Sequence, residues 1–282
     1  MRFYLPNRKR FLIFFRHSAS SRFATITSFP GNTPCGSWER SAISRSTSVK
    51  VSIMQPYIFP WIGYFQLISQ SDIFVLYDDA NYIKQGYINR NSLLCNGQVH
   101  QFTLQVPGAS SFKRIGELTF SDQMTKIVKT IAQSYCKAPY FSSVMPLVEK
   151  VLLQPNRDIT FCCQLAIESI FDYLGLNLTI LRSSTLSYDR HESAENKVIG
   201  MCHDLGASVY VNNLGGRHLY NANHFAQRGI ALRFLEGRNM PYYQGIETFV
   251  PNLSIIDVLM HCEPEQVRRA LETYSCSTPV VE

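Results

Sequence analysis

From residue 50 onward the sequence alternates between short runs rich in β-branched and aromatic residues and longer stretches with helical spacing. The short runs have the length and composition of buried or half-buried strands. They lie at residues 51–55, 73–77, 101–106, 178–181, 208–211 and 231–235. Strands separated by helices in this way are typical of α/β proteins, whose sheets are mainly parallel. We therefore expect an α/β fold with a mainly parallel sheet.

A block of helices interrupts this alternation at about residues 120–175. Apolar positions of its first helix share one face: Met124, Ile127, Val128, Ile131 and Tyr135. Ser121 is the expected N-cap of that helix, and Gly175 suits the position just after the last helix of the block. We expect a single α/β domain of the catalytic type over residues 49–282, with this block as a helical insert.

Several helix starts can be predicted after the insert. Helices are expected near residues 192–205 and 219–227, and two more close the chain. Ser254 and Asp257 have the spacing of a capping box for the first closing helix. Pro264 suits the opening position of the second.

The first 48 residues form a basic, Ser- and Arg-rich leader. Residues 1–50 hold nine of the 27 Lys and Arg residues and one of the 21 Asp and Glu residues. This composition fits a targeting peptide, whereas the short apolar stretch at 11–15 fits a secretory signal less well. We favour a third explanation, in which translation starts near Val49 and the leader is untranslated or disordered.

The remaining chain excludes several classes of protein. After residue 50 there are 18 Lys and Arg against 20 Asp and Glu, so we expect no nucleic-acid partner. No window reaches the roughly 18 consecutive apolar residues of a membrane span, so we expect no stable membrane insertion. None of the eight Cys lies in a C-x-x-C pattern, and the His residues lack metal-ligand spacing. The sequence predicts a cytoplasmic protein with reduced thiols and no zinc site.

Two adjacent carboxylates, Asp78 and Asp79, follow the strand expected at 73–77. Open α/β sheets bind ligands at this carboxyl edge. One of the pair would suit a general base or a Mg²⁺ ligand. The alternative is that one of them only caps the next element. The sequence leaves both interpretations open.

The segment after these carboxylates combines cations, amides and aromatic rings. Lys84 and Arg90 suit an anionic, hydroxyl-rich ligand such as a sugar nucleotide, because a guanidinium grips phosphate while amides and phenols bind hydroxyls. The alternatives are an ion pair between Arg90 and Asp78 and a solvated Lys84. The neighbouring candidates for ligand contacts are Tyr82, Asn89 and Asn91.

Three further segments could carry chemistry. Pro60, Gly63 and Tyr64 open a helix as in adenylyl transferases of the HIGH superfamily, but Tyr64, itself a candidate for contact with the substrate, stands where those enzymes have an imidazole. His191 lies near an expected helix start, where it would suit an acid or base, or simply belong to an exposed capping segment. The glycines of the third segment would let backbone amides cradle an anion before the next helix; its candidate residues are Asn212, Gly215, Gly216 and Tyr220.

These motifs together resemble the WbqC-like family, over about residues 51–262. The resemblance is carried by I-M-Q-P-Y-I-F-P-W-I-G-Y-F-Q-L-I, Y-D-D-x-x-Y-I-K, I-N-R-N, Y-V-N-N-L-G-G-R-H-L-Y and F-V-P-N-L-S-I-I-D-V-L. It implies a role in the synthesis of O-antigen and other surface polysaccharides, as a transferase that moves an acyl or aminoacyl (glycyl-type) group onto an amino sugar or sugar nucleotide.

The resemblance also implies roles for residues and partners. Asp78 or Asp79 would be the general base, Lys84 and Arg90 would hold phosphate, and the Gly215–Gly216 turn would bind an anionic donor or product. Hydroxyls would be oriented by Asn89, Asn91, Tyr82 and Gln55. The co-substrate would be an activated acyl donor, and a carrier protein or another enzyme of the glycan cluster would be a partner. The rival functions are a nucleotidyltransferase-like enzyme and a non-catalytic carbohydrate-binding or scaffold protein.

Overall fold

A six-stranded sheet forms the centre of residues 48–279, the part of the chain that the computed structural model describes. The expectations for the leader lie almost entirely outside these residues. The strands are β1 (Lys50–Met54), β2 (Ile73–Leu76), β5 (Ile180–Arg182), β6 (Val209–Asn213), β7 (Ala231–Gly237) and β8 (Tyr274–Ser277). Their order is β5-β2-β1-β6-β7-β8, and only β7 and β8 pair antiparallel. This order is that of Rossmann-type doubly wound sheets, and the expected α/β fold is confirmed.

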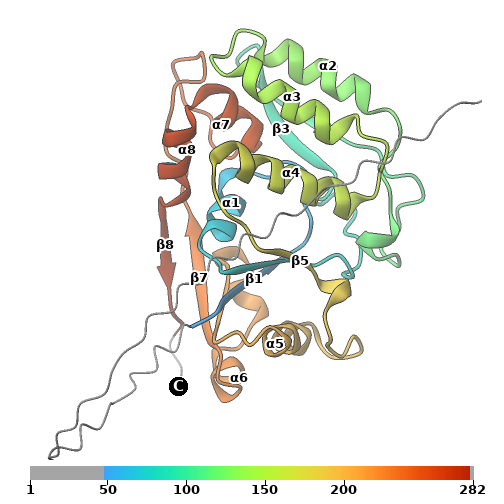
Figure 1. Cartoon of the computed structure of the whole chain (residues 1–282), viewed down its shortest axis with the longest axis vertical. Coiled ribbons are helices and arrows are strands. Elements are labelled where there is room, and N and C mark those ends of the chain that lie inside the picture. Colours follow the sequence, from blue (N-terminus) through green and yellow to red (C-terminus); the bar gives the residue numbers. More distant parts are fainter. Residues whose placement is uncertain (1–47, 280–282) are drawn as a thin grey trace, which may run out of the picture. The chain divides into compact units, whose positions relative to one another are not determined.

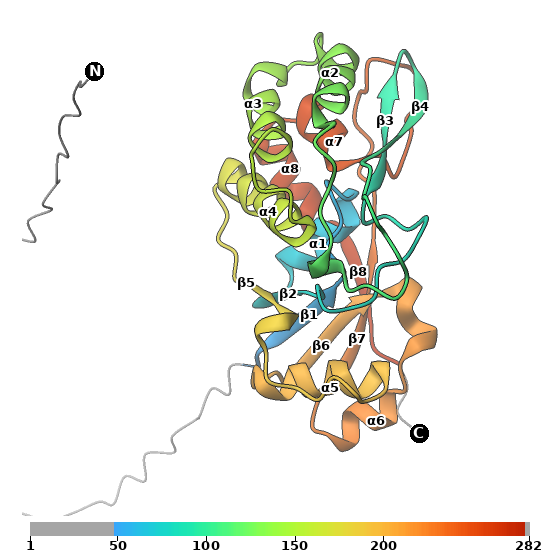
Figure 2. The same cartoon turned by 90° about the vertical axis from the view of Figure 1, so that its right-hand side faces the viewer.

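Helices cover both faces of this sheet (Figures 1 and 2). One face carries α5 (Ala194–Asp204) and α6 (Ala222–Gln227), and the other carries α1 (Ile62–Ser69), α4 (Ile159–Leu174) and α8 (Pro264–Leu271). The side chains of β6 alternate between the two buried clusters, as successive residues of a strand must. Val209 and Val211 join the cluster of α1, whereas Tyr210 joins that of α5 and α6.

The helical insert is confirmed as three helices between the fourth and fifth strands. They are α2 (Met124–Tyr135), α3 (Phe141–Leu152) and α4. The predicted end of α4 is also confirmed, because Gly175 adopts a left-handed φ of 66°. The predicted N-cap of α2 was wrong: the helix begins after Gln123, and Ser121 Oγ instead accepts a hydrogen bond from the Gln123 amide at 3.4 Å.

A hairpin precedes the insert. It consists of β3 (Arg90–Cys95) and β4 (Gln98–Thr103), joined at Asn96 and Gly97, whose φ angles of 50° and 75° suit a tight turn. Arg90 and Asn91, two candidates for ligand contacts, are the first two residues of β3. Their backbones are therefore fixed by strand pairing.

The start of α7 (Ile255–His261) differs from the expected capping box. Ser254 does cap the helix, since its Oγ accepts a hydrogen bond from the Ile256 amide at 3.3 Å. Asp257 does not reach back to the N-cap, because its carboxylate is bonded to side chains of other elements. The prediction for α8 is confirmed, with Pro264 in its first turn.

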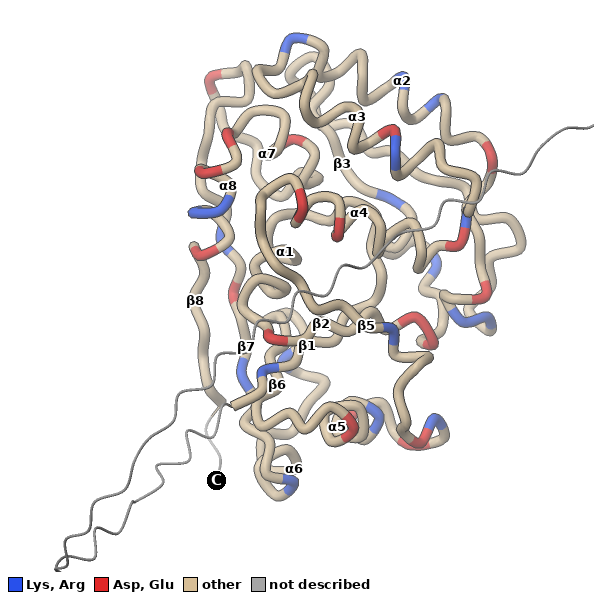
Figure 3. The backbone as a smooth tube through the Cα atoms, viewed as in Figure 1, with Lys and Arg blue, Asp and Glu red and all other residues tan. Residues whose placement is uncertain are grey.

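None of the helices between residues 48 and 279 combines the length and the apolar composition that crossing a membrane requires. Basic and acidic residues are mixed along the helices and loops of this part of the chain (Figure 3).

Gln66, fully buried in α1, ties that helix to β7 and α8. Its Nε2 lies 2.8–2.9 Å from the carbonyl oxygens of Arg238, Ala270 and Thr273, and its Oε1 accepts from the Arg238 amide at 3.0 Å. We expect Gln66→Met to lower the free energy of unfolding by about 2 kcal/mol, because methionine leaves these backbone groups without partners. Urea unfolding measures the loss. A loss no larger than that of Gln133→Met, on the exposed side of α2, would contradict the prediction.

Candidate functional site

The carboxyl ends of four parallel strands collect polar residues at one edge of the sheet. Gln55 follows β1, Asp78 follows β2, Ser183 follows β5, and Asn212 is the penultimate residue of β6. The chain leaves β1 and β6 toward opposite sides of the sheet, and doubly wound sheets bind ligands outside this point of reversal. The topology therefore directs attention to the segment that leaves β1.

That segment, residues 55–61, forms one wall of a cavity of about 410 Å³. We call this cavity the aromatic pocket. It is lined by Tyr57, Pro60, Trp61, Tyr87, Asn91 and Asn252. The rings of Tyr57 and Tyr87 lie 6.3 Å apart at an interplanar angle of 60°. The pocket thus offers several aromatic faces together with the side-chain amide of Asn252, whereas the Asn91 side chain already donates to the Phe59 carbonyl and accepts from the Ser92 amide.

Unusual backbone geometry shapes this pocket. Phe59 has a φ of 44°, a left-handed conformation that costs a bulky residue on the order of 1–3 kcal/mol. Its carbonyl oxygen is held by Asn91 Nδ2 and by Ser254 Oγ, the latter at 2.8 Å. Asn252, also in the pocket wall, has a φ of 60°. Strain of this kind clusters at ligand sites, and here it turns the chain so that Pro60 and Trp61 face the pocket.

The chemistry of the aromatic pocket suits a hydroxyl-bearing ring. Aromatic faces carry partial negative charge that attracts the C–H groups of a sugar ring, and amides both donate to and accept from hydroxyls. Burial and the nearby Tyr87 raise the pKa of Tyr57, so its hydroxyl remains a donor. Sequence reasoning singled out the segment but missed Tyr57 and Trp61, because aromatic residues in such a motif are equally typical of a core.

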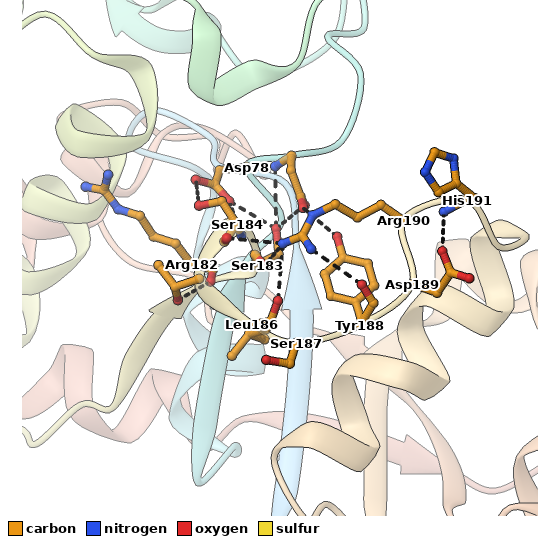
Figure 4. A network of polar contacts seen from close by, with 12 residues as sticks. Asp78, Arg182, Ser183, Ser184, Leu186, Ser187, Tyr188, Asp189, Arg190 and His191 are labelled. Atoms are coloured by element: carbon orange, nitrogen blue, oxygen red, sulfur yellow. Dashed lines mark hydrogen bonds and ion pairs between the residues drawn. The ribbon is translucent and has the colours of Figure 1, made fainter.

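The two aspartates that follow β2 lie in a network with residues 183–190. Figure 4 shows Asp78 beside Ser183 and Ser184. Asp78 is 4% exposed and accepts from Ser183 Oγ at 3.0 Å, from the Ser184 amide at 2.9 Å and from Ser184 Oγ at 2.8 Å. These bonds hold the one-turn 3-10 helix Ser183–Thr185 against the end of β2. Asp78 therefore caps a helix, but that helix lies about a hundred residues further along the chain.

Asp79 forms the ionic part of the same network. Its carboxylate accepts from Ser183 Oγ, from the Tyr188 hydroxyl at 2.6 Å and from Arg190 Nε at 2.9 Å. Arg190 also donates to the carbonyl oxygens of residues 183, 184 and 186, and its guanidinium lies 4.6 Å from the ring centre of Tyr188. Burial and the Asp79 carboxylate raise the pKa of Tyr188 well above its usual value. Nothing in the sequence identified Arg190 as this partner.

These contacts separate the aspartates from the cations that the sequence analysis grouped with them. Lys84 and Arg90 line a different cavity, of about 280 Å³, with Tyr82 and Asn89. Arg90 Nε donates to the Gly86 carbonyl at 2.9 Å, and its guanidinium lies 6.0 Å from the ring centre of Tyr87. Neither aspartate lines this cavity. Within residues 48–279 Arg90 and Asp78 form no ion pair. The aspartates and the two cations therefore do not share one cleft.

Several candidate ligand contacts are committed to the interior. Tyr64 is 1% exposed, and its hydroxyl donates to the Gln55 carbonyl at 2.8 Å, so it has no surface for a ligand. Asn89 accepts from the Tyr82 hydroxyl at 2.9 Å and donates to the Leu104 carbonyl at 2.7 Å. Gln55 Oε1 lies 3.5 Å from the hydroxyl of Tyr57, and Gln55 does not line the aromatic pocket.

The remaining candidates lie away from these cavities. His191 is exposed three residues before α5, and Figure 4 shows it on the far side of Arg190 from Asp78. The glycines follow β6 in a 3-10 helix, Leu214–Leu219, and the α-helix expected from 219 begins only at Ala222. Gly216 is explained by packing, since a Cβ there would lie 2.6 Å from Asn212 Nδ2, whereas Gly215 is exposed. Tyr220 packs edge-on against Tyr210 and Phe225.

A magnesium ion does not fit the aspartates. Asp79 already accepts hydrogen bonds from a guanidinium and a tyrosine hydroxyl, and Asp78 accepts them from two serine hydroxyls. Between residues 48 and 279, no group of three His, Cys, Asp or Glu side chains is arranged to hold a metal ion.

Comparisons with known proteins place these features in a family. The model of the WbqC-like protein family matches residues 55–269, a range that includes the aromatic pocket and the Asp79–Arg190 network. The uncharacterized protein Rv1507c of Mycobacterium tuberculosis is 24% identical over 221 residues, which cover 77% of this chain and 95% of that protein. No solved structure matches the chain significantly.

Proposed function

This chain belongs to the WbqC-like protein family, and we propose that it is a transferase of surface-polysaccharide synthesis that holds a sugar or sugar nucleotide in the aromatic pocket. One observation supports the proposal: a pocket of aromatic rings and an asparagine amide lies beside the segment that leaves β1, one of the two strands at which the strand order reverses. Pockets at this place in α/β sheets bind ligands.

The proposed reaction moves an acyl or aminoacyl group from an activated donor to an amino sugar. The amine nitrogen bonds to the acyl carbon, the bond from that carbon to the leaving group breaks, and the leaving group takes up the amine proton. Lys84 and Arg90 supply two cations for a phosphate of the substrate, near the pocket residue Tyr87. Asp78 and Asp79 hold residues 183–190 in place and are not assigned as bases, because their oxygens already accept hydrogen bonds.

Trp61 provides the direct test of the pocket. We expect Trp61→Leu to weaken the binding of UDP-N-acetylglucosamine about tenfold, because the variant loses an aromatic face while it stays apolar. Isothermal titration calorimetry measures the affinity. Phe112→Leu, at an aromatic residue that is 94% exposed and outside the pocket, is the matched control. Equal affinities in both variants would contradict the proposal.

The biological test is the surface glycan of a strain that lacks the gene. We expect the glycan to lose one N-linked acyl or aminoacyl substituent and to regain it with the intact gene. A glycan of unchanged composition would contradict the transferase assignment.

A non-catalytic carbohydrate-binding protein is the second candidate. Both aspartates after β2 already accept hydrogen bonds, so neither carboxylate is free to act as a base, and this favours the non-catalytic candidate. Calorimetric binding of the sugar nucleotide combined with an unchanged glycan in the deletion strain would support this alternative. The nucleotidyltransferase alternative loses support, because Tyr64 lies in the core where those enzymes present an imidazole.

A further inference from the structure

A second and larger cavity, of about 620 Å³, lies beside α7 and away from the aromatic pocket. We call it the α7 cavity. Its walls come from the turn of the β3–β4 hairpin, the end of α2, residues 242–246, α7 and α8. They include Asn96, Lys137, Tyr243, His261 and Gln266. Neither the proposed sugar site nor the Asp79–Arg190 network uses any of these residues.

A fully buried carboxylate, that of Asp257, organises one wall of this cavity. It accepts from the Tyr135 hydroxyl at 2.9 Å, from the Tyr242 hydroxyl at 2.6 Å and from Gln244 Nε2 at 2.8 Å. Burial and the Asp257 carboxylate raise the pKa of both tyrosines well above the usual value, so both hydroxyls remain donors. The arrangement fixes two aromatic rings around the neighbouring histidine.

That histidine, His261, is held in one orientation. Its Nδ1 lies 2.9 Å from the Asp257 carbonyl oxygen and 3.8 Å from Asp257 Oδ2, so Nδ1 must carry the hydrogen. The rings of Tyr135 and Tyr242 flank the imidazole, with centroids 5.8 and 6.2 Å away. His261 lines the cavity, and within the described residues its Nε2 makes no hydrogen bond. In the neutral ring Nε2 is therefore an acceptor open to a ligand.

The other unused polar groups of the wall indicate what kind of ligand fits. Asn96 and Gln266 make no side-chain hydrogen bonds with other residues in the 48–279 range, and such amides bind hydroxyls. Lys137 is the one Lys or Arg in the wall, and no Asp or Glu lines it. The Asp257 carboxylate lies behind this wall and is bonded to donors of Tyr135, Tyr242 and Gln244, so the charge that faces a ligand in the cavity is that of Lys137, which favours an acidic ligand.

We propose that the α7 cavity binds a hydroxylated small acid of the size of a uronic acid, with a hydroxyl donating to Nε2 of His261 and the carboxylate facing Lys137. Asp257 and the two tyrosines are positioning residues that fix the imidazole. The site goes beyond the proposed function, since it does not depend on what the aromatic pocket binds.

The test uses the full chain, labelled with ¹⁵N in its histidines, and D-glucuronate as the probe. His261→Asn identifies the Nε2 signal by its loss, and it keeps an amide donor near the Asp257 carbonyl. We expect an Nε2 without a hydrogen in the neutral ring, and a saturable shift of this signal with glucuronate. Lys137→Gln is expected to bind glucuronate about fivefold more weakly. His203→Asn, at an exposed position of α5, is the matched control and should bind like the wild type.

Two outcomes would overturn the proposal. One is an Nε2 signal that does not move with glucuronate. The other is a glucuronate affinity that Lys137→Gln and His261→Asn leave unchanged. Trp61→Leu separates this site from the proposed function, because it should weaken the binding of the sugar nucleotide and leave the binding of glucuronate unchanged. The amide spectrum of each variant shows that it is folded, so that a lost affinity reports the cavity.

Discussion

Replacing Arg190 with methionine is expected to lower the free energy of unfolding by about 3 kcal/mol, among the largest losses for a single side chain of this protein. The substitution leaves the carboxylate of Asp79, only 5% exposed, without its cation. It also removes the donor to three backbone carbonyls. Removing one partner of a buried ion pair typically costs about 3–5 kcal/mol, and the 31% exposure of Arg190 places this case at the low end.

Urea unfolding of a double-mutant cycle tests this prediction. Asp79→Asn removes the charge that Arg190→Met would leave stranded, so the double variant should lose clearly less stability than the sum of the two single variants. Arg228→Met, exposed at the end of α6, is the matched control and should change stability by no more than about 0.5 kcal/mol. An additive cycle would show that the pair does not hold residues 183–190 to β2.

The elements that depend on nearby residues could be predicted from the sequence. The apolar face of α2, the bounds of α4 and the turn at Asn96 and Gly97 each follow from a local pattern. The position of each strand in the sheet could not, because β1 pairs with β2 and also with β6, about 160 residues away. Edge strand β8 was also missed, since its short polar run lacks a strand pattern.

The candidate site shows the same division between local and distant contacts. The distinctive segment 55–61 could be recognised, but the partners of its neighbours could not. Asp79 and Arg190 are 111 residues apart, and Asp257 and Tyr135 are 122 apart. The spacing of Ser254 and Asp257 is the same whether the carboxylate turns back to the helix start or reaches across to α2. Only the tertiary structure distinguishes these two cases.

Gly63→Ala is expected to damage both the fold and the aromatic pocket. Gly63 lies in the first turn of α1, and a Cβ there would overlap the six-membered ring of Trp61. Trp61 must then leave its position in the pocket wall. We expect a loss of about 3 kcal/mol in the free energy of unfolding, the upper range for overpacking, and a sugar-nucleotide affinity at least about tenfold weaker.

The sign of the effect separates this explanation from helix propensity. In a helix without the clash, alanine is more favourable than glycine by up to about 1 kcal/mol, so propensity alone predicts that Gly63→Ala stabilises the protein. The three atoms nearest to the added Cβ all belong to Trp61. In a Trp61→Ala background, the same substitution should therefore become neutral or stabilising. Gly215→Ala, where a Cβ meets nothing within 4 Å, is the matched control and should leave both stability and affinity near wild type. If Gly63→Ala still lowers the free energy of unfolding in the Trp61→Ala background, then the Trp61 ring is not what requires glycine at this position. The close approach of Gly237 in β7 to Gly63 would then be the reason.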